Sequence, residues 1–251
     1  MPPLPEAFIT HPIAHRAYHD SAAGRPENSR AAVRAAVAAG YGIEIDLQLS
    51  RDGAPMVFHD YDLSRLTGAQ GPLGTRTAAE LAAIPLRHGT EGIPTLTEVL
   101  EDVAGRVPLL IEIKDQDGDL GPNIGALEAA TAAALAGYKG PVAVMSFNPH
   151  SVAAMARLLP QVPRGLTTSA YDYADWAPVT PATCDRLREI PDYDRTGASF
   201  ISHEAHDLSR PRVAALKAQG SRVLCWTIRS AAADAEARKI AENVTFEGYA
   251  A

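Results

Sequence analysis

Short runs of β-branched and aliphatic residues alternate with alanine-rich stretches of helical periodicity along most of the 251-residue chain. Strands that alternate with helices favour a parallel sheet, because returning to a parallel strand needs a long crossover connection. We expect eight strands, at Ile9–Arg16, Gly42–Ser50, Leu109–Lys114, Val142–Phe147, Arg164–Thr168, Ser199–His203, Arg222–Ile228 and Asn243–Glu247.

Two architectures satisfy this alternation, a closed (β/α)8 barrel and an open, doubly wound sheet. Eight strands and a length near 250 residues are typical of the closed TIM barrel. The phosphate-binding signatures GxGxxG and GxxxxGK[ST], common in open sheets, follow none of the strands. We therefore predict that residues 1–251 form one (β/α)8 barrel domain. Its helices are expected at Asn28–Ala39, Gly121–Ala136, His150–Leu159, Pro211–Gln219 and Ala231–Ala241.

One connection is longer than a barrel needs. Residues 51–108 separate two consecutive long strands, whereas connections in α/β units are usually short apart from their helix. We interpret this segment as a small insertion after the second strand. It is expected to contain a short strand at Met56–His59 and a helix near Thr95–Ala104.

Charge and hydropathy exclude several classes of protein. With 23 basic against 30 acidic residues, the net charge of −7 disfavours binding to nucleic acid or to an anionic membrane surface. No apolar run approaches the roughly 18 residues of a membrane span, and the first residues lack a secretory signal. Two cysteines are too few for a disulfide framework. A cytoplasmic enzyme with a small-molecule substrate is the expectation, with its oligomeric state left open.

The second strand carries acidic residues on one face only. Glu44 and Asp46 alternate with aliphatic residues, and Glu112 and Lys114 alternate in the same way on the third long strand. A half-solvated antiparallel sheet shows the same pattern. The flanking helices argue against it, since crossover helices cover the apolar face. The polar face is then expected to point into the barrel.

Buried, isolated carboxylates are costly, so a cation or a set of donors has to hold them. Glu44, Asp46 and Glu112 offer hard oxygen ligands from adjacent strands, which suit Mg²⁺ or Ca²⁺. Lys114 on the same face is either a structural ion-pair partner of these carboxylates or a ligand for a substrate oxyanion.

Two histidines lie at strand ends, where barrel enzymes place their chemistry. His15 is followed by Arg16, whose planar guanidinium matches a phosphate, and His59 is followed by Asp60. A lone histidine is more often structural. Two of them beside three inward carboxylates indicate a general acid and a general base.

The motifs occur in a characteristic order: His15-Arg16, Pro26-Glu27-Asn28-Ser29, Glu44-Ile45-Asp46-Leu47, Arg51-Asp52-Gly53, Val57-Phe58-His59-Asp60 and Glu112-Ile113-Lys114. This series resembles the glycerophosphodiester phosphodiesterase family over roughly residues 11–115. Ser146-Phe147 and Trp226-Thr227 support the resemblance more weakly.

The resemblance implies a TIM barrel with a small insertion, here residues 60–108, and release of sn-glycerol 3-phosphate and an alcohol. It also implies a divalent metal, Mg²⁺ or Ca²⁺. Carried over onto this chain, its roles are metal binding by Glu44, Asp46 and Glu112, catalysis by His15 and His59, phosphate contacts from Arg16 and Lys114, and a supporting carboxylate near the metal at Glu27.

Two positions depart from the family. Ala17 stands where the family usually has glycine, and Asn243–Gly248 replaces a Gly-Ile-Ile-Thr-Asp-type segment. The second departure leaves the substrate's non-phosphate end undetermined. Two alternatives to the hydrolase therefore remain, a phospholipase D-type lyase that acts on lysophospholipids and a catalytically idle, metabolite-binding barrel.

Three further features are open to a functional interpretation. Trp226 fits the substrate pocket as well as it fits the core. The segment Tyr171–Trp176 is interpreted as a solvated loop anchored by its aromatic residues, with a wall of the alcohol pocket as the alternative. His203 and His206 are interpreted as structural, although their spacing would allow a second metal site.

Overall fold

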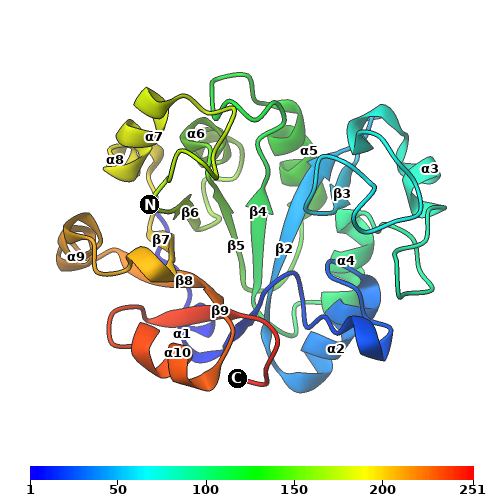
Figure 1. The fold of residues 1–251 in the computed structure, drawn as a ribbon, viewed down its shortest axis with the longest axis horizontal. Coiled ribbons are helices and arrows are strands. Elements are labelled where there is room, and N and C mark those ends of the chain that lie inside the picture. The colour runs from blue at the N-terminus through cyan, green and yellow to red at the C-terminus, as the bar shows by residue number, and fades with distance from the viewer.

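Eight parallel strands form a closed barrel in the computed structural model, which describes residues 1–251. They are β1 (Ile13–Ala14), β2 (Gly42–Leu49), β4 (Leu109–Ile113), β5 (Val142–Ser146), β6 (Arg164–Thr168), β7 (Phe200–Glu204), β8 (Arg222–Ile228) and β9 (Asn243–Phe246). The barrel closes because β1 pairs in parallel with both β9 and β2 (Figure 1). The predicted (β/α)8 barrel is confirmed, and the open sheet is excluded.

Helices surround the barrel and connect its strands (Figure 1). The main ones are α2 (Arg30–Ala39), α4 (Leu96–Val103), α5 (Ala126–Leu135), α6 (Pro149–Leu158), α7 (Pro181–Arg188), α8 (Tyr193–Thr196), α9 (Pro211–Ala218) and α10 (Ala231–Ala237). Neither α7 nor α8 is among the expected helices, although Thr180 caps α7 and Pro181 begins it, a recognisable start signal. None of the helices combines the length and hydropathy that crossing a membrane requires.

The two faces of β2 meet different surroundings. Ile43 and Ile45 belong to one apolar cluster with Val33 of α2 and Val99 of α4, in the layer between barrel and helices. Glu44, between them in sequence, lines a cavity inside the barrel. The apolar face therefore lies against the helices, and the alternative of a half-solvated antiparallel sheet is wrong.

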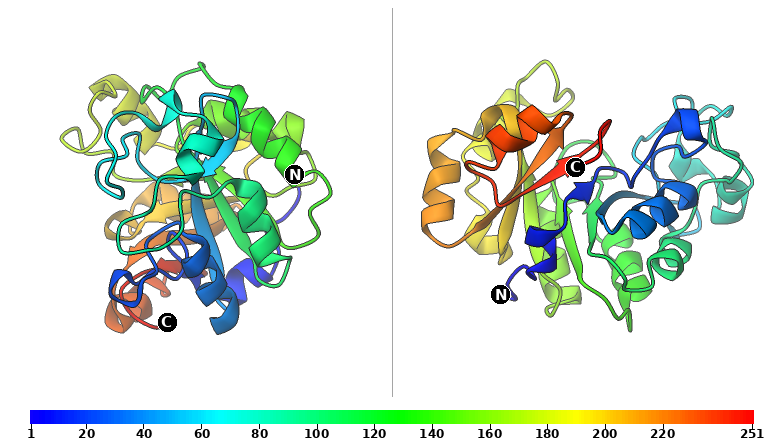
Figure 2. Two further views of the ribbon diagram at one scale, coloured as in Figure 1. Left: turned by 90° about the vertical axis from the view of Figure 1, so that its right-hand side faces the viewer. Right: turned by 90° about the horizontal axis from the view of Figure 1, so that it is seen from below.

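The amino-terminal segment closes the base of the barrel. The strand predicted over Ile9–Arg16 forms as β1 at Ile13–Ala14 only, because α1 (Ala7–Thr10) makes its first residues helical. Leu4 and Phe8 belong to the apolar cluster that fills the barrel base, and Phe8 is fully buried. Burial of this aromatic ring under the barrel competes with extension of the strand. Figure 2 shows the amino-terminal segment in blue against the barrel.

The connection between β2 and β4 lies outside the barrel, drawn in cyan (Figures 1 and 2). It begins with β3 (Pro55–Val57), which pairs antiparallel with β2, and includes α3 (Ala78–Ala82). This part has a small apolar core of its own: Met56, Phe58, Leu63, Leu73, Leu81, Leu86 and Ile93. In contrast, α4 packs in the main core with α2, so it serves as a regular crossover helix of the barrel. Short 3₁₀ turns occupy Ser21–Ala23, Leu73–Thr75 and Ala205–Asp207.

Candidate active site

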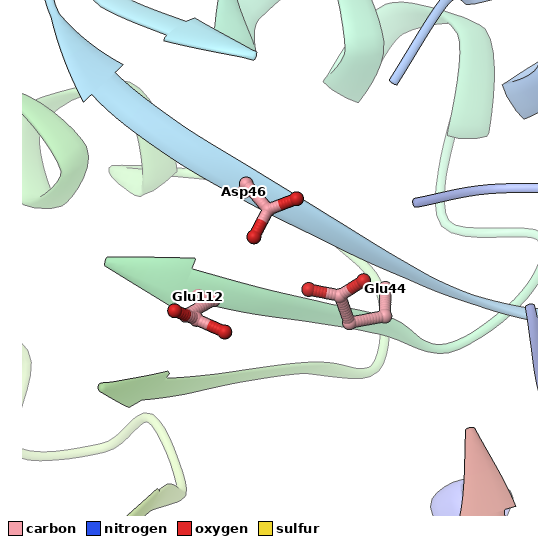
Figure 3. A group of neighbouring side chains, drawn as sticks. All are labelled: Glu44, Asp46 and Glu112. Atoms are coloured by element: carbon pink, nitrogen blue, oxygen red, sulfur yellow. The ribbon is translucent and has the colours of Figure 1, made fainter. Parts of the chain in front are cut away.

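Three carboxylates converge inside the carboxyl end of the barrel. Glu44 and Asp46 extend from β2 and Glu112 extends from β4, with Asp46 and Glu112 in register on the paired strands. One oxygen of each lies within 4.8 Å of the others, and all three side chains are buried. Figure 3 shows the three carboxylates turned toward the same space. The structure thus brings together the three residues expected to bind metal.

Lys114 reaches two of these carboxylates. Its Nζ lies 2.8 Å from Asp46 Oδ1 and 2.6 Å from Glu112 Oε1. Burial alone would raise the pKa of Asp46, but the charges of Lys114, His59 and Arg16 outweigh it and hold that pKa below its usual range. The lysine therefore acts as an ion-pair partner in this structure, while its ammonium also lines the cavity.

Glu44 is the least compensated of the three carboxylates. It accepts a hydrogen bond from the backbone N–H of Arg16 at 2.8 Å and has no cationic side chain paired with it. Burial, and then the charges of Asp46 and Glu112, raise the pKa of Glu44 well above its usual value. A divalent cation among these oxygens would remove both penalties, so the donor set fits Mg²⁺ or Ca²⁺.

We expect Glu44→Gln to leave the cation-free protein at least as stable as the parent. Because the folded-state pKa of Glu44 is raised, the protonated Glu44 carboxyl stabilises the folded parent at low pH. This contribution to stability is lost as the pH rises through that pKa. The neutral amide has no such loss. The advantage of the variant in melting temperature, measured in EDTA, should therefore be larger at pH 8 than at pH 5.

A contrary result would reassign the residue. If Glu44→Gln lowers the melting temperature strongly at both pH values, the carboxylate is a structural ion-pair member. Glu98→Gln is a useful control, because Glu98 is a surface residue whose carboxylate caps α4 outside the cavity.

Each of the two predicted catalytic histidines is hydrogen-bonded to a carboxylate through the same ring nitrogen. His15 Nδ1 lies 2.6 Å from Glu247 Oε2, and His59 Nδ1 lies 2.7 Å from Asp60 Oδ1. Both rings line the cavity that holds the carboxylate cluster. With Nδ1 engaged, Nε2 is the ring nitrogen left for a substrate, an arrangement typical of histidines oriented for proton transfer.

The environment of His15 favours its neutral form. Burial lowers the pKa of His15 and outweighs the hydrogen bond to Glu247, which raises it. A neutral imidazole with a free Nε2 can accept a proton near neutral pH.

Arg16 is held at the cavity by its backbone and by Glu27. Its Nη1 donates to Glu27 Oε1 at 2.8 Å, and Arg65 donates twice to the same carboxylate, at 2.9 and 2.8 Å. Arg16 Nε is buried without a hydrogen-bond partner. Glu27 therefore orients the guanidinium, and its Nε lies 3.6 Å from Asp46 Oδ2, an ion-pair distance without a hydrogen bond.

Ala17 keeps the backbone conformation that the family's glycine would favour. Its φ of 65° lies in the left-handed region, next to Arg16 at 50°. The left-handed conformation costs about 1–2 kcal/mol in a residue with a Cβ. The methyl group is buried in the outer core, which offsets part of this cost. The departure at Ala17 has thus left the turn that presents Arg16 in place.

Uncharged side chains also line the cavity, which encloses about 180 Å³. Two of them are Thr167 and Thr245, whose buried hydroxyls have no hydrogen-bond partner. Trp226 is half-buried, lines the cavity and donates from Nε1 to the carbonyl of Ser202 at 3.0 Å. Of the two interpretations of Trp226, the geometry favours the pocket.

Sequence reasoning missed two supporting residues. Glu247 lies in the atypical last-strand segment and was not given a role, yet it holds His15. Asn28 was quoted in a motif only, yet its buried amide donates to Asp46 Oδ2 at 2.9 Å. Its φ of 58°, a conformation that asparagine adopts more readily than most residues, is a signal that a sequence cannot display.

The candidate second metal site does not form. His203 is fully buried, with Nδ1 2.8 Å from Thr168 Oγ1 and Nε2 near Asp207. His206 lies in the 3₁₀ turn that follows and joins no cluster of ligands. His203 therefore has structural contacts within the barrel wall, whereas His206 is exposed.

The fold and the site together define a TIM-barrel enzyme that handles an anionic substrate beside a carboxylate cluster and two oriented histidines. The chain belongs to the glycerophosphoryl diester phosphodiesterase family, whose sequence model matches residues 15–244. It is accordingly a phosphodiesterase that acts on glycerophosphodiesters.

Individual relatives agree with this assignment. The chain is 27% identical over 228 residues to YhdW of Bacillus subtilis (strain 168), covering 87% of this chain and 86% of that protein. It is 32% identical over 164 residues to a glycerophosphodiester phosphodiesterase of Caldanaerobacter subterraneus subsp. tengcongensis, covering 61% of this chain and 65% of that protein. The structure matches that of an Oleispira antarctica phosphodiesterase in complex with the product sn-glycerol-3-phosphate, with a TM-score of 0.78, 26% identity and coverage of 96% and 94%.

Proposed function

We propose that the protein hydrolyses glycerophosphodiesters to sn-glycerol 3-phosphate and an alcohol, with a divalent cation held by Glu44, Asp46 and Glu112. The observation that carries the proposal is the placement of two histidine–carboxylate pairs and a buried carboxylate cluster around one cavity. The product bound to the Oleispira antarctica relative supports the same chemistry.

The cation, Mg²⁺ or Ca²⁺, would supply Lewis-acid polarisation of a phosphoryl oxygen. Arg16 binds another phosphate oxygen through its guanidinium, whose Nη1 is held by Glu27 and whose Nε lies 3.6 Å from Asp46 Oδ2. Lys114 balances the charge of Asp46 and Glu112 and presents its ammonium to the phosphate. Preorganised donors of this kind stabilise charge that develops on the transferred phosphoryl group.

His15 and His59 exchange protons with the nucleophile and the leaving group. One Nε2 accepts the proton of the attacking nucleophile, and the other donates a proton to the departing alkoxide. Water supplies the oxygen that the phosphate gains in the overall hydrolysis. Glu247 and Asp60 hold the Nδ1 side of each ring, which fixes the tautomer and stabilises the imidazolium.

The cavity is better matched to a glycerol moiety than to an acyl chain. Its volume of about 180 Å³ suits a phosphate with a short polyol. The unpartnered hydroxyls of Thr167 and Thr245 would pair with glycerol hydroxyls, which repays the cost of burying them. This supports a soluble glycerophosphodiester substrate over the lysophospholipid of the lyase alternative.

A substrate panel tests the proposal. Glycerophosphocholine, glycerophosphoethanolamine, glycerophosphoglycerol and lysophosphatidylcholine are assayed in EDTA and after adding back Mg²⁺, Ca²⁺ or Mn²⁺. We expect no turnover in EDTA and release of sn-glycerol 3-phosphate from the soluble diesters once the cation returns.

The other outcomes separate the alternatives. A cyclic phosphate formed from the lysolipid identifies a lyase. Cation binding without turnover of any substrate identifies an idle binding barrel. Full turnover in EDTA, with no metal found in the protein, removes cation dependence from the proposal.

A cytoplasmic location is part of the proposal. Cys184 and Cys225 are both buried and unbonded, as is usual in a reducing compartment.

A further inference from the structure

A second, larger recess opens beside the catalytic cavity. It encloses about 670 Å³ and shares five lining residues with the cavity, among them His59, Phe147 and Trp226. We call it the outer groove. Because the groove begins at the phosphate site, a group attached to the phosphate extends directly into it.

Aromatic rings form much of the outer groove. Tyr61, Phe147, Trp176 and Trp226 all line it. Phe147 packs edge-on against both tryptophans, with ring centroids 4.8 Å from Trp176 and 5.5 Å from Trp226. The hydrogen bond of Trp226 to the carbonyl of Ser202 fixes one indole in place. The loop Tyr171–Trp176 is therefore more than a solvated connection, since its tryptophan helps to build the groove.

Acidic side chains predominate among the charged residues of the outer groove. Asp62 and Asp175 line it from two separate loops, are exposed and have no ion-pair partner. Hydrogen bonds from Ser64 lower the pKa of Asp62, which keeps it ionised. The lysine among the lining residues, Lys114, is already paired with Asp46 and Glu112.

Carboxylates beside aromatic side chains favour an organic cation. Ring faces attract ammonium groups, most strongly on tryptophan, and a quaternary ammonium loses little hydration on contact with them. An anionic or acyl substituent would meet uncompensated carboxylates in the same place. On the premise of the proposed function, the geometry points to the outer groove as a subsite for the leaving alcohol that selects an alcohol bearing a quaternary ammonium group.

A pair of isosteric substrates isolates the charge. The first is glycerophosphocholine, and the second is its uncharged analogue, the glycerophosphodiester of 3,3-dimethylbutanol. The two leaving alcohols have the same shape. The quantity measured is the ratio of kcat/KM for the cationic ester to that for the neutral one, with the cation present, in the parent and in each variant.

We expect this ratio to fall about 3- to 30-fold in the double variant Asp62→Asn with Asp175→Asn, and by a similar factor in Trp176→Leu. The different leaving abilities of the two alcohols cancel when variants are compared. The ratio is also insensitive to partial unfolding, since both esters are assayed on one preparation. Asp172→Asn is the matched control, because Asp172 is exposed on the same loop and does not line the groove. Its ratio should equal that of the parent.

Two results would overturn the subsite. One is an unchanged ratio in the groove variants, and the other is an equal fall in the Asp172→Asn control, which would indicate only a diffuse surface field. Failure of the proposed function can be distinguished from failure of the subsite alone. In the first case the parent would release sn-glycerol 3-phosphate from neither ester, and the subsite would be refuted as well.

Discussion

Replacing His15 or His59 by alanine should lower kcat by about 100- to 10,000-fold, the usual size of a general acid–base contribution. Both rings line the cavity, and both engage a carboxylate through Nδ1, so each variant removes an oriented Nε2. Cation affinity should change little, because the three carboxylates are the expected ligands. Steady-state kinetics and a cation titration of the same preparations measure both effects.

The pH dependence and the leaving group separate the two roles. The parent should show a bell-shaped profile of kcat/KM, and each variant should lose one limb of it. A nitrophenyl ester needs little protonation as it departs. It should therefore restore turnover to the variant that lacks the general acid and leave the other variant slow.

Loss of cation binding in both variants, with no rescue by the nitrophenyl ester, would show that the histidines are ligands. Loss of melting temperature with most of the activity retained would show that they are structural. His206→Ala serves as a control, since His206 lies outside the cavity.

Gly165→Ala should destabilise the barrel by about 1–3 kcal/mol, the usual cost of overpacking a core. A Cβ at this position would lie 2.3 Å from Cε2 of Phe200, the fully buried residue beside it on β7. Phe200 cannot move away freely, since it packs with Phe8 and Leu224 in the barrel base. The melting temperature, measured by calorimetry, should fall by about 2–4 °C for each kcal/mol.

A double-mutant cycle identifies the collision as the cause. Phe200→Leu alone should destabilise by leaving a cavity, but it should relieve part of the cost of Gly165→Ala when the two are combined. Gly68→Ala is the matched control, because nothing lies within 4 Å of a Cβ built there. Strictly additive effects of Gly165→Ala and Phe200→Leu would contradict this account.

Much of the active site follows from local periodicity. Glu44 and Asp46 lie two residues apart on a strand, which places both on one face, and the aliphatic residues between them assign that face to the barrel interior. The register of β2 with β4 then places Glu112 beside Asp46. His15 follows the barrel strand β1, whereas His59 reaches the same cavity from the antiparallel strand β3. These features depend on patterns within short segments, which a sequence displays directly.

Other features depend on how distant segments meet. Glu247 orients His15 across 232 positions of sequence, a contact that exists only because β9 closes the barrel against β1. The helix α1 replaces only the first residues of the predicted strand, because Phe8 is buried under the barrel base. Such contacts form because the assembled fold buries these groups together. No periodic pattern in the sequence predicts them.

The sequence by itself therefore determined the barrel, the inward carboxylates and the position of His15 at a strand end, because alternation with period 2 and helical periodicity dictate which face of each element is buried. Only the tertiary structure decided the residues that hold these groups in place and the outer groove between Asp62 and Trp176. The reason is that loops from different strand ends meet only after the barrel has closed, and their separation in space is independent of their separation along the chain.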